Sequence, residues 1–223
     1  MKIIYALWGQ SLGSQLLAPS LHGALQTAGA TRLHVNIDDA DVAPAKLRIT
    51  SFAAPVSAVV TVWVDGQPAE VSRLLTDISE RCAGWEVEER TPLEPPHTGP
   101  GERTPGLAQM AFLRIPDELD EAEWRHRWQD LHTPVAIETQ ATFGYTQNRV
   151  LRPILGDERV DAIVEELFPM EAMTSLHAFY GSGGDDAELG RRLDRMMKSV
   201  TSFGADRNLD SVPTSRYIFD LEP

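Results

Sequence analysis

Hydrophobic positions in the first half of the chain follow two periods, and each change of period marks a new element. Alternating or β-branched runs predict strands, because successive side chains of a strand point to opposite faces; these runs cover residues 2–8, 32–38, 57–65 and 84–93. Apolar residues three or four positions apart predict helices over 13–29 and 67–84, with Pro19 either kinking the first helix or marking its start. The resulting order, β-α-β-β-α-β, is that of a ferredoxin-like unit.

The second half repeats this order with less regular boundaries. Strands are predicted over residues 107–116, 141–150, 171–181 and 214–221. Helices are predicted over 120–140 and 185–203, and residues 160–168 as a short helical insertion or bent crossover. A shift of the first half by 110 positions lays Leu33 on Phe143 and Val35 on Tyr145 without a gap. This overlay favours a duplication, with a degenerate first repeat, over two unrelated α+β halves.

A segment rich in proline separates the halves. Residues 91–106 hold five of the 15 prolines of the chain and three glycines. Proline lacks an amide hydrogen, so this segment cannot be a central strand or the interior of a helix. We expect a first unit over 1–90, a linker over 91–106 and a second unit over 107–223.

Each ferredoxin-like unit leaves one face of its sheet without helices. Packing the two bare faces together predicts an α+β fold, in which the tandem units form a dimeric α/β barrel within one chain. In the strand over 32–38 the polar side chains should face the barrel interior; they are Arg32, His34, Asn36 and Asp38. The matching inward residues of the second half are Thr142, Thr146 and Asn148. Tyr145 and Gln147 then lie on the helix side, unless a bulge reverses the faces.

Charge and apolar content narrow the classes of partner. The formal net charge is −13 over 223 residues, and no basic stripe is visible, which argues against nucleic acid. No run of about 18 apolar residues predicts a membrane span, and Trp8-Gly9-Gln10 interrupts the N-terminal apolar run that a signal peptide would need. The single Cys82 suits a reducing compartment. We therefore expect a cytoplasmic protein.

An ordered set of motifs in the second half resembles the EthD family of the dimeric α/β-barrel superfamily. The set is Trp128 and His132, Tyr145 with Gln147 and Asn148, Asp161 with Glu165, and Met197 and Ser199 before Phe203 and Asp206. The resemblance covers about residues 107–221. The first half resembles the family only through its overlay on the second half. Members of this family usually close their barrel by dimerising, so the resemblance implies that this chain closes it internally.

The resemblance also implies a range of activities. Relatives include cyclases and dehydratases of aromatic polyketide pathways, cofactor-free monooxygenases and accessory proteins of degradation pathways, and their ligands tend to be apolar and aromatic. Some distant barrel relatives bind haem. A shared fold does not choose among these functions.

The stretch EWRHRWQDLHTPVA holds the main catalytic candidate. Trp124, Trp128, Leu131 and Val135 follow the spacing of a buried helix face. His132 then lies one turn beyond Trp128. An imidazole titrates near neutral pH, so His132 suits general acid or base chemistry at a cavity rim. The alternative is a hydrogen-bonded histidine at a helix end.

Two further residues are catalytic candidates with structural alternatives. His177 shares a predicted strand face with Phe179 and either lines the cavity or is a satisfied core histidine. Arg114 interrupts an apolar strand and either binds an anionic or carbonyl group of the substrate or pairs with a carboxylate such as Glu165. The candidate ligand-binding residues are Trp128, Tyr145, Asn148, His34, Asn36 and Phe179. The histidines show no metal-ligand spacing, so no metal and no cofactor are expected; haem at His132 or His177 is a weaker option.

Together these features predict a cofactor-independent enzyme of cyclase, dehydratase, lyase or monooxygenase type. It would act on a small hydrophobic aromatic or polyketide-like compound by histidine acid–base catalysis, as a monomeric barrel or a homodimer. The alternative is a non-catalytic protein that binds or delivers an apolar aromatic metabolite. The substrate and the reaction type stay open.

Overall fold

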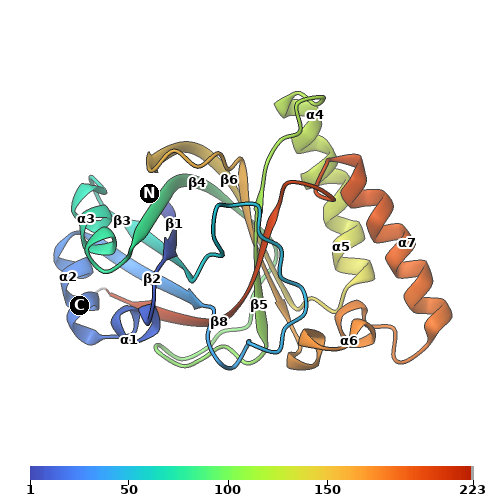
Figure 1. Cartoon of the computed structure of the whole chain (residues 1–223), viewed down its shortest axis with the longest axis horizontal. Coiled ribbons are helices and arrows are strands. Elements are labelled where there is room, and N and C mark those ends of the chain that lie inside the picture. Colours follow the sequence, from blue (N-terminus) through green and yellow to red (C-terminus); the bar gives the residue numbers. More distant parts are fainter. Residues whose placement is uncertain (222–223) are drawn as a thin grey trace.

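A closed, antiparallel β-barrel lies at the centre of the computed structural model, which describes residues 1–221 (Figure 1). Its strands are β1 (Lys2–Trp8), β2 (Ala30–Ile37), β3 (Ala58–Val64), β4 (Arg81–Leu93), β5 (Leu107–Leu113), β6 (Gly144–Leu155), β7 (Ala162–Phe168) and β8 (Asp210–Asp220). Around the barrel they run in the order β1-β3-β2-β8-β5-β7-β6-β4. The first half supplies β4-β1-β3-β2 and the second half β8-β5-β7-β6, the same ferredoxin-like order twice.

Pairs between the two halves close the barrel. Strand β2 pairs with β8, where Val35 lies opposite Tyr217, and β4 pairs with β6, where Glu88 lies opposite Arg149. Every strand therefore has two neighbours, so neither sheet keeps an open edge. This topology confirms the predicted tandem ferredoxin-like units and their intrachain dimeric α/β barrel.

The helices form two layers on opposite sides of the barrel (Figure 1). The first layer consists of α1 (Leu12–Leu16), α2 (Pro19–Thr27) and α3 (Ala69–Asp77). The second consists of α4 (Glu121–Arg125), the π-helix η1 (His126–His132), α5 (Thr133–Thr139), the 3-10 helix η2 (Met170–Met173), α6 (Leu176–Tyr180) and α7 (Asp186–Ser202). Pro19 is the first residue of α2, where its missing amide hydrogen breaks no helical bond.

Alternation along each strand divides the core into separate clusters. In β1, Ile4, Ala6 and Trp8 join the cluster inside the barrel, whereas Ile3 and Tyr5 join the one beneath the first helices. Both faces of the strand are thus apolar, because each face meets a different core. The third main cluster packs between β8-β5-β7-β6, which we call the second sheet, and α4–α7, around Trp124 and Trp128.

Two predicted elements of the second half are wrong. Residues 160–168, predicted as a short helical insertion or bent crossover, contain strand β7. Both faces of this strand are buried, so its sequence shows no simple alternation. Residues 171–181, expected to be a strand, contain η2 and α6 instead. Ser175 begins α6 by accepting a bond from the amide of Ala178, and Gly181 ends it with a positive φ of 61°.

Two irregular segments complete the barrel. The proline-rich segment begins within β4, and its far end is tied to β8, where Gly101 N donates to Ile218 O at 2.7 Å and Thr104 N donates to Arg216 O at 2.8 Å. The long connection over residues 38–57 crosses to the second half, where Ile49 pairs with Ser211. No helix within residues 1–221 is long and apolar enough to cross a membrane.

Candidate functional site

Two neighbouring carboxylates on β7 point to opposite sides of the second sheet and mark two cavities. Glu165 faces the barrel interior, where it contacts Asn36 and Arg216. Glu166 faces the helices and lines an apolar space of about 290 Å³, which we call the helix-side cleft. A second space of about 280 Å³ lies at one end of the barrel and is called the barrel mouth.

The helix-side cleft is a largely apolar space between the second sheet and its helices. Strands β5, β6 and β7 form its floor, and η1, α6 and α7 form its walls. The rim includes Leu47, Ile49 and Met197, which are 41%, 39% and 49% exposed. Its remaining apolar or aromatic lining includes Leu113, Trp128, Tyr145, Val164, Phe179, Tyr180, Met196, Val200 and Phe203. Such a space suits a small ligand with a large apolar surface.

The π-helix sets which residues of η1 face this cleft. Each turn of a π-helix holds an extra residue, and such turns are frequent at functional sites. Trp128 is fully buried, but Leu131 is 54% exposed, whereas His132 is only 8% exposed. The expected burial of Leu131 is therefore wrong, because the wider turn moves Leu131 outward and His132 into the interior.

His132 is buried beside aromatic and hydroxyl groups. Its Nδ1 lies 2.9 Å from the Ser199 hydroxyl on α7, and its ring centroid lies 4.8 Å from that of Phe203. Burial lowers the pKa of His132 to about 4, so the imidazole is neutral at pH 7. With Nδ1 bonded to Ser199, Nε2 is left as the ring nitrogen that can meet a ligand.

Glu166 is the residue of the cleft that the sequence analysis missed. Its Oε1 is shielded from solvent and has no hydrogen-bond partner among residues 1–221. Burial raises the pKa of Glu166 to about 7. An unpaired carboxyl group in an apolar space is a candidate acid or base. The sequence feature that could have indicated Glu166 is the pair Glu165-Glu166. It is informative only when the segment is interpreted as a strand, because the two side chains then point to opposite faces.

Tyr145 and Gln147 lie on the helix side of β6, as the register predicts. Tyr145 is fully buried, and its hydroxyl accepts a bond from Gln147 Nε2 at 3.1 Å. Burial, with Glu166 nearby, raises the pKa of Tyr145, so the phenol stays protonated. Gln147 Nε2 also lies 2.9 Å from Thr133 Oγ1, which ties the floor of the cleft to α5.

Phe179 lines the cleft from α6 rather than from a strand. Its ring stacks on that of Phe168 at 4.3 Å between centroids, with an interplanar angle of 17°. Phe179 and His177 therefore do not share a strand face. His177 instead contacts Ser182 at 2.6 Å and Asp186 at 3.3 Å, and it lines neither cavity.

Arg114 lies at the end of the barrel opposite the mouth. Its Nη2 lies 2.8 Å from Asp210 Oδ2, and its guanidinium lies 4.6 Å from the centroid of the Phe52 ring. The carboxylate that pairs with Arg114 is thus Asp210, not the suggested Glu165. The pair is almost fully buried, and its geometry is that of a structural ion pair.

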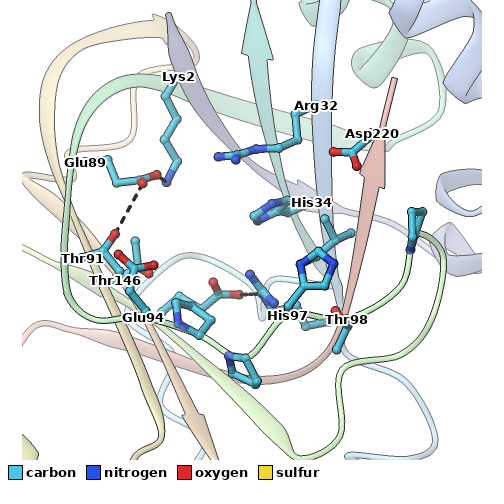
Figure 2. Close-up of a pocket in the computed structure, with 16 residues that line it drawn as sticks. Lys2, Arg32, His34, Glu89, Thr91, Glu94, His97, Thr98, Thr146 and Asp220 are labelled. Carbon is cyan, nitrogen blue, oxygen red and sulfur yellow. Dashed lines mark hydrogen bonds and ion pairs between the residues drawn. The ribbon is translucent and has the colours of Figure 1, made fainter. Parts of the chain in front are cut away.

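Three predicted ligand-binding residues lie inside the barrel rather than in the cleft. Asn36 donates to Glu165 Oε1 at 2.9 Å and to Thr214 Oγ1 at 3.1 Å. Asn148 accepts a bond from Lys2 Nζ at 2.6 Å. His34 lines the mouth itself, where Figure 2 shows it among Lys2, Arg32 and His97. The sequence register for β2 and β6 is therefore correct, but it leads to a different cavity from that of His132.

Charge is concentrated in the barrel mouth. Lys2 pairs with Glu89, and Arg216 Nε lies 3.1 Å from Glu165 Oε1. Burial, and then the positive charge of Arg216, Arg32 and Lys2, hold the pKa of His34 well below its ordinary value. Within residues 1–221, no three His, Cys, Asp or Glu side chains group together as a metal site would require.

Comparison with solved structures identifies the fold. A crystal structure of an anthrone oxidase-like protein matches with a TM-score of 0.53 and 10% identity, over 100% of this chain and 93% of that one. A putative monooxygenase from Fusobacterium nucleatum matches with a TM-score of 0.49 and 9% identity, over 98% of this chain and 93% of the other. No family model and no curated protein matches the chain. The EthD resemblance and the duplication therefore stay predictions.

Proposed function

We propose that the chain is a cofactor-independent enzyme of the oxygenase type, acting on a small hydroxylated aromatic compound in the helix-side cleft. The observation that carries this proposal is the meeting of Glu166 and His132 at one apolar space. An uncharged imidazole and a carboxyl group with a pKa near 7 can share proton transfer at neutral pH.

The unpaired polar atoms of the cleft favour a ligand with hydroxyl groups. Oε1 of Gln109, of Gln140 and of Glu166 are buried acceptors without partners among the described residues. Gln109 Nε2 already donates to Leu47 O and Ser211 Oγ, so its free atom is the acceptor. Buried acceptors left unpaired are costly, and phenolic hydroxyl groups would supply the missing donors.

The chemistry follows from the roles of these residues. Glu166, ionised, takes a proton from an acidic C–H of the bound aromatic compound. His132 Nε2 hydrogen-bonds to the substrate oxygen that gains negative charge, if Ser199 donates to Nδ1. The electron-rich carbanion then transfers an electron to O₂ and bonds to it, and the resulting peroxide anion takes back the proton held by Glu166. Loss of water from this hydroperoxide leaves a carbonyl. The balance is CH₂ plus O₂ giving C=O plus H₂O.

The choice of oxygenation over cyclisation or dehydration rests on a likeness of fold. It is motivated by the anthrone oxidase-like protein that shares the fold across the whole chain. Anthrone has an acidic CH₂ group between two aromatic rings and is therefore a test substrate for the reacting group, although it lacks the phenolic hydroxyl groups of the proposed ligand.

Turnover of anthrone in air tests the proposal. The wild-type chain should consume O₂ and form anthraquinone, measured by an oxygen electrode and by mass spectrometry. Glu166→Gln should lower kcat by a factor of about 100 or more, and His132→Gln by a smaller factor. Glu138→Gln is the matched control, because Glu138 is an exposed glutamate of α5. Unchanged kcat in both cleft variants would remove these residues from the mechanism.

The non-catalytic alternative is favoured by one observation. A histidine with a pKa of about 4 is a weak base and carries little of the protonated form at pH 7. A protein that only holds an aromatic metabolite would show saturable stabilisation by anthrone and no product by mass spectrometry.

A further inference from the structure

The barrel mouth is lined by charged side chains. Apolar side chains could fill the interior of a barrel of this size instead. The middle of the interior holds an apolar cluster, with Ile4, Trp85 and Ile163 among its fully buried residues. Toward the mouth the inward positions change to Lys2, Arg32, His34, Glu165 and Arg216. Buried charges contribute little net stability, since desolvation offsets their attraction, so the mouth calls for another explanation.

Two acidic groups of the mouth, the buried Glu165 and the exposed Glu89, already have cationic partners. Glu165 is 8% exposed and is held by Arg216 and by the amide of Asn36. Glu89 pairs with Lys2. The two other carboxylates of the lining, Glu94 and Asp220, are exposed at the rim, where water screens them.

Among residues 1–221, Arg32 is the cation of the mouth whose guanidinium remains without an acceptor. It forms no hydrogen bond or ion pair with the residues that the structure describes, and its Nε is buried and unsatisfied. The guanidinium lies 3.5 Å from the centroid of the Trp63 ring, which fixes it in the mouth. A guanidinium held by an aromatic face keeps its N–H donors free for a planar anion.

His34 stands next to Arg32 on the same face of β2. Its ring centroid lies 4.6 Å from that of Trp63, and no hydrogen bond joins its ring nitrogens to residues 1–221. Since burial, and then nearby positive charge, lower the pKa of His34 and keep its imidazole neutral, it offers one N–H donor without adding charge. Figure 2 shows Arg32 and His34 bordering one space, with His97 and Glu94 from the proline-rich segment across it.

We propose that the barrel mouth is a second binding site, for a small carboxylate-bearing molecule whose carboxylate is held by Arg32 and His34. One free guanidinium and one neutral donor match one carboxylate group of a ligand. A phosphate dianion is disfavoured, because it would bring both of its charges close to Glu89 and Glu165 while the other cations are already paired. The volume of about 280 Å³ admits a small metabolite, and the proline-rich segment forms its roof.

Calorimetric titration with succinate tests this site, with succinamide as its uncharged analogue and inorganic phosphate as the competing anion. Succinate should bind at one site per chain, and Arg32→Gln should weaken binding by on the order of tenfold or more. Arg73→Gln is the matched control, since it removes one exposed arginine of α3 and should leave affinity unchanged. His34→Gln provides a second variant, expected to weaken binding by a smaller factor.

Separate outcomes would overturn the proposal. Absence of succinate binding by the wild-type chain would do so, as would equal affinity in Arg32→Gln and the wild type. Tighter binding of phosphate than of succinate, or equal binding of succinamide, would contradict a carboxylate site. Glu166→Gln should leave succinate binding intact, because Glu166 lies on the other side of the sheet; failure of anthrone turnover therefore leaves this test unaffected.

Discussion

Glu165 and Glu166 show how one step along a strand separates two environments. Glu165 enters the barrel and meets a guanidinium at 3.1 Å, whereas Glu166 enters the helix-side cleft with a buried oxygen that has no partner. The sequence places two carboxylates together but does not say which face each occupies. That depends on reading the segment as a strand and on its register, which tertiary pairing decides.

The raised pKa of Glu166 predicts a pH-dependent loss of stability. The unfolded chain releases this proton near pH 4.5 and the folded chain near pH 7. The contribution of Glu166 to the free energy of unfolding is therefore complete below about pH 4.5 and lost as the pH rises to about 7. Relative to Glu166→Gln, the wild type should lose at most about 3 kcal/mol between pH 4.5 and 8.

Urea unfolding of both proteins at several pH values measures this difference. The variant isolates Glu166 from the other carboxylates, which titrate in both chains. Glu138→Gln serves as the exposed control and should run parallel to the wild type. If the free energy of unfolding of Glu166→Gln also changes with pH in parallel with that of the wild type, the carboxyl group of Glu166 is solvated in the wild type.

At the scale of elements, the π-helical turn of η1 determines which of its side chains line the helix-side cleft. Periodicity correctly predicts a helix with both tryptophans buried, but it assumes an α-helical turn throughout. The extra residue per turn puts Leu131 in solvent and His132 in the interior. No local pattern marks this change, because the reason lies in packing against α7 and the sheet. The predicted strand over 171–181 fails similarly, since aromatic residues suit a strand as well as a short helix.

The exposure of Leu131 gives a direct test of the π-helical register. Leu131→Ala should change the free energy of unfolding by no more than about 0.5 kcal/mol, as expected for a surface site. Trp128→Ala should cost about 3–5 kcal/mol, because it leaves a cavity in the core. Chemical denaturation of both variants provides the values. A cost above about 2 kcal/mol for Leu131→Ala would show that Leu131 is buried, as an α-helical turn would place it.

At the scale of the whole molecule, the barrel depends on both halves. The repeated element order and the alternating polar face of β2 together predict the closed barrel, and the topology confirms it. The sequence does not show that the connection over residues 38–57 reaches the second half and supplies Leu47 and Ile49 to the cleft rim. Long loops carry no periodic signal, so their destinations are known only from the fold.

Closure between the halves predicts a single cooperative unfolding transition. Each half alone would expose its interior face and two strand edges, those of β2 and β4 or of β6 and β8. Calorimetry should therefore give a van't Hoff enthalpy equal to the calorimetric enthalpy. Two resolved transitions would instead indicate two units that fold independently.

The most direct test of the central claim is a crystal structure of the chain with bound anthrone. The proposed function predicts that the ligand lies in the helix-side cleft, with its rings against Trp128 and Phe203 and its oxygen within hydrogen-bonding distance of His132. A ligand bound outside this cleft, or one whose reacting carbon lies far from Glu166, would contradict it.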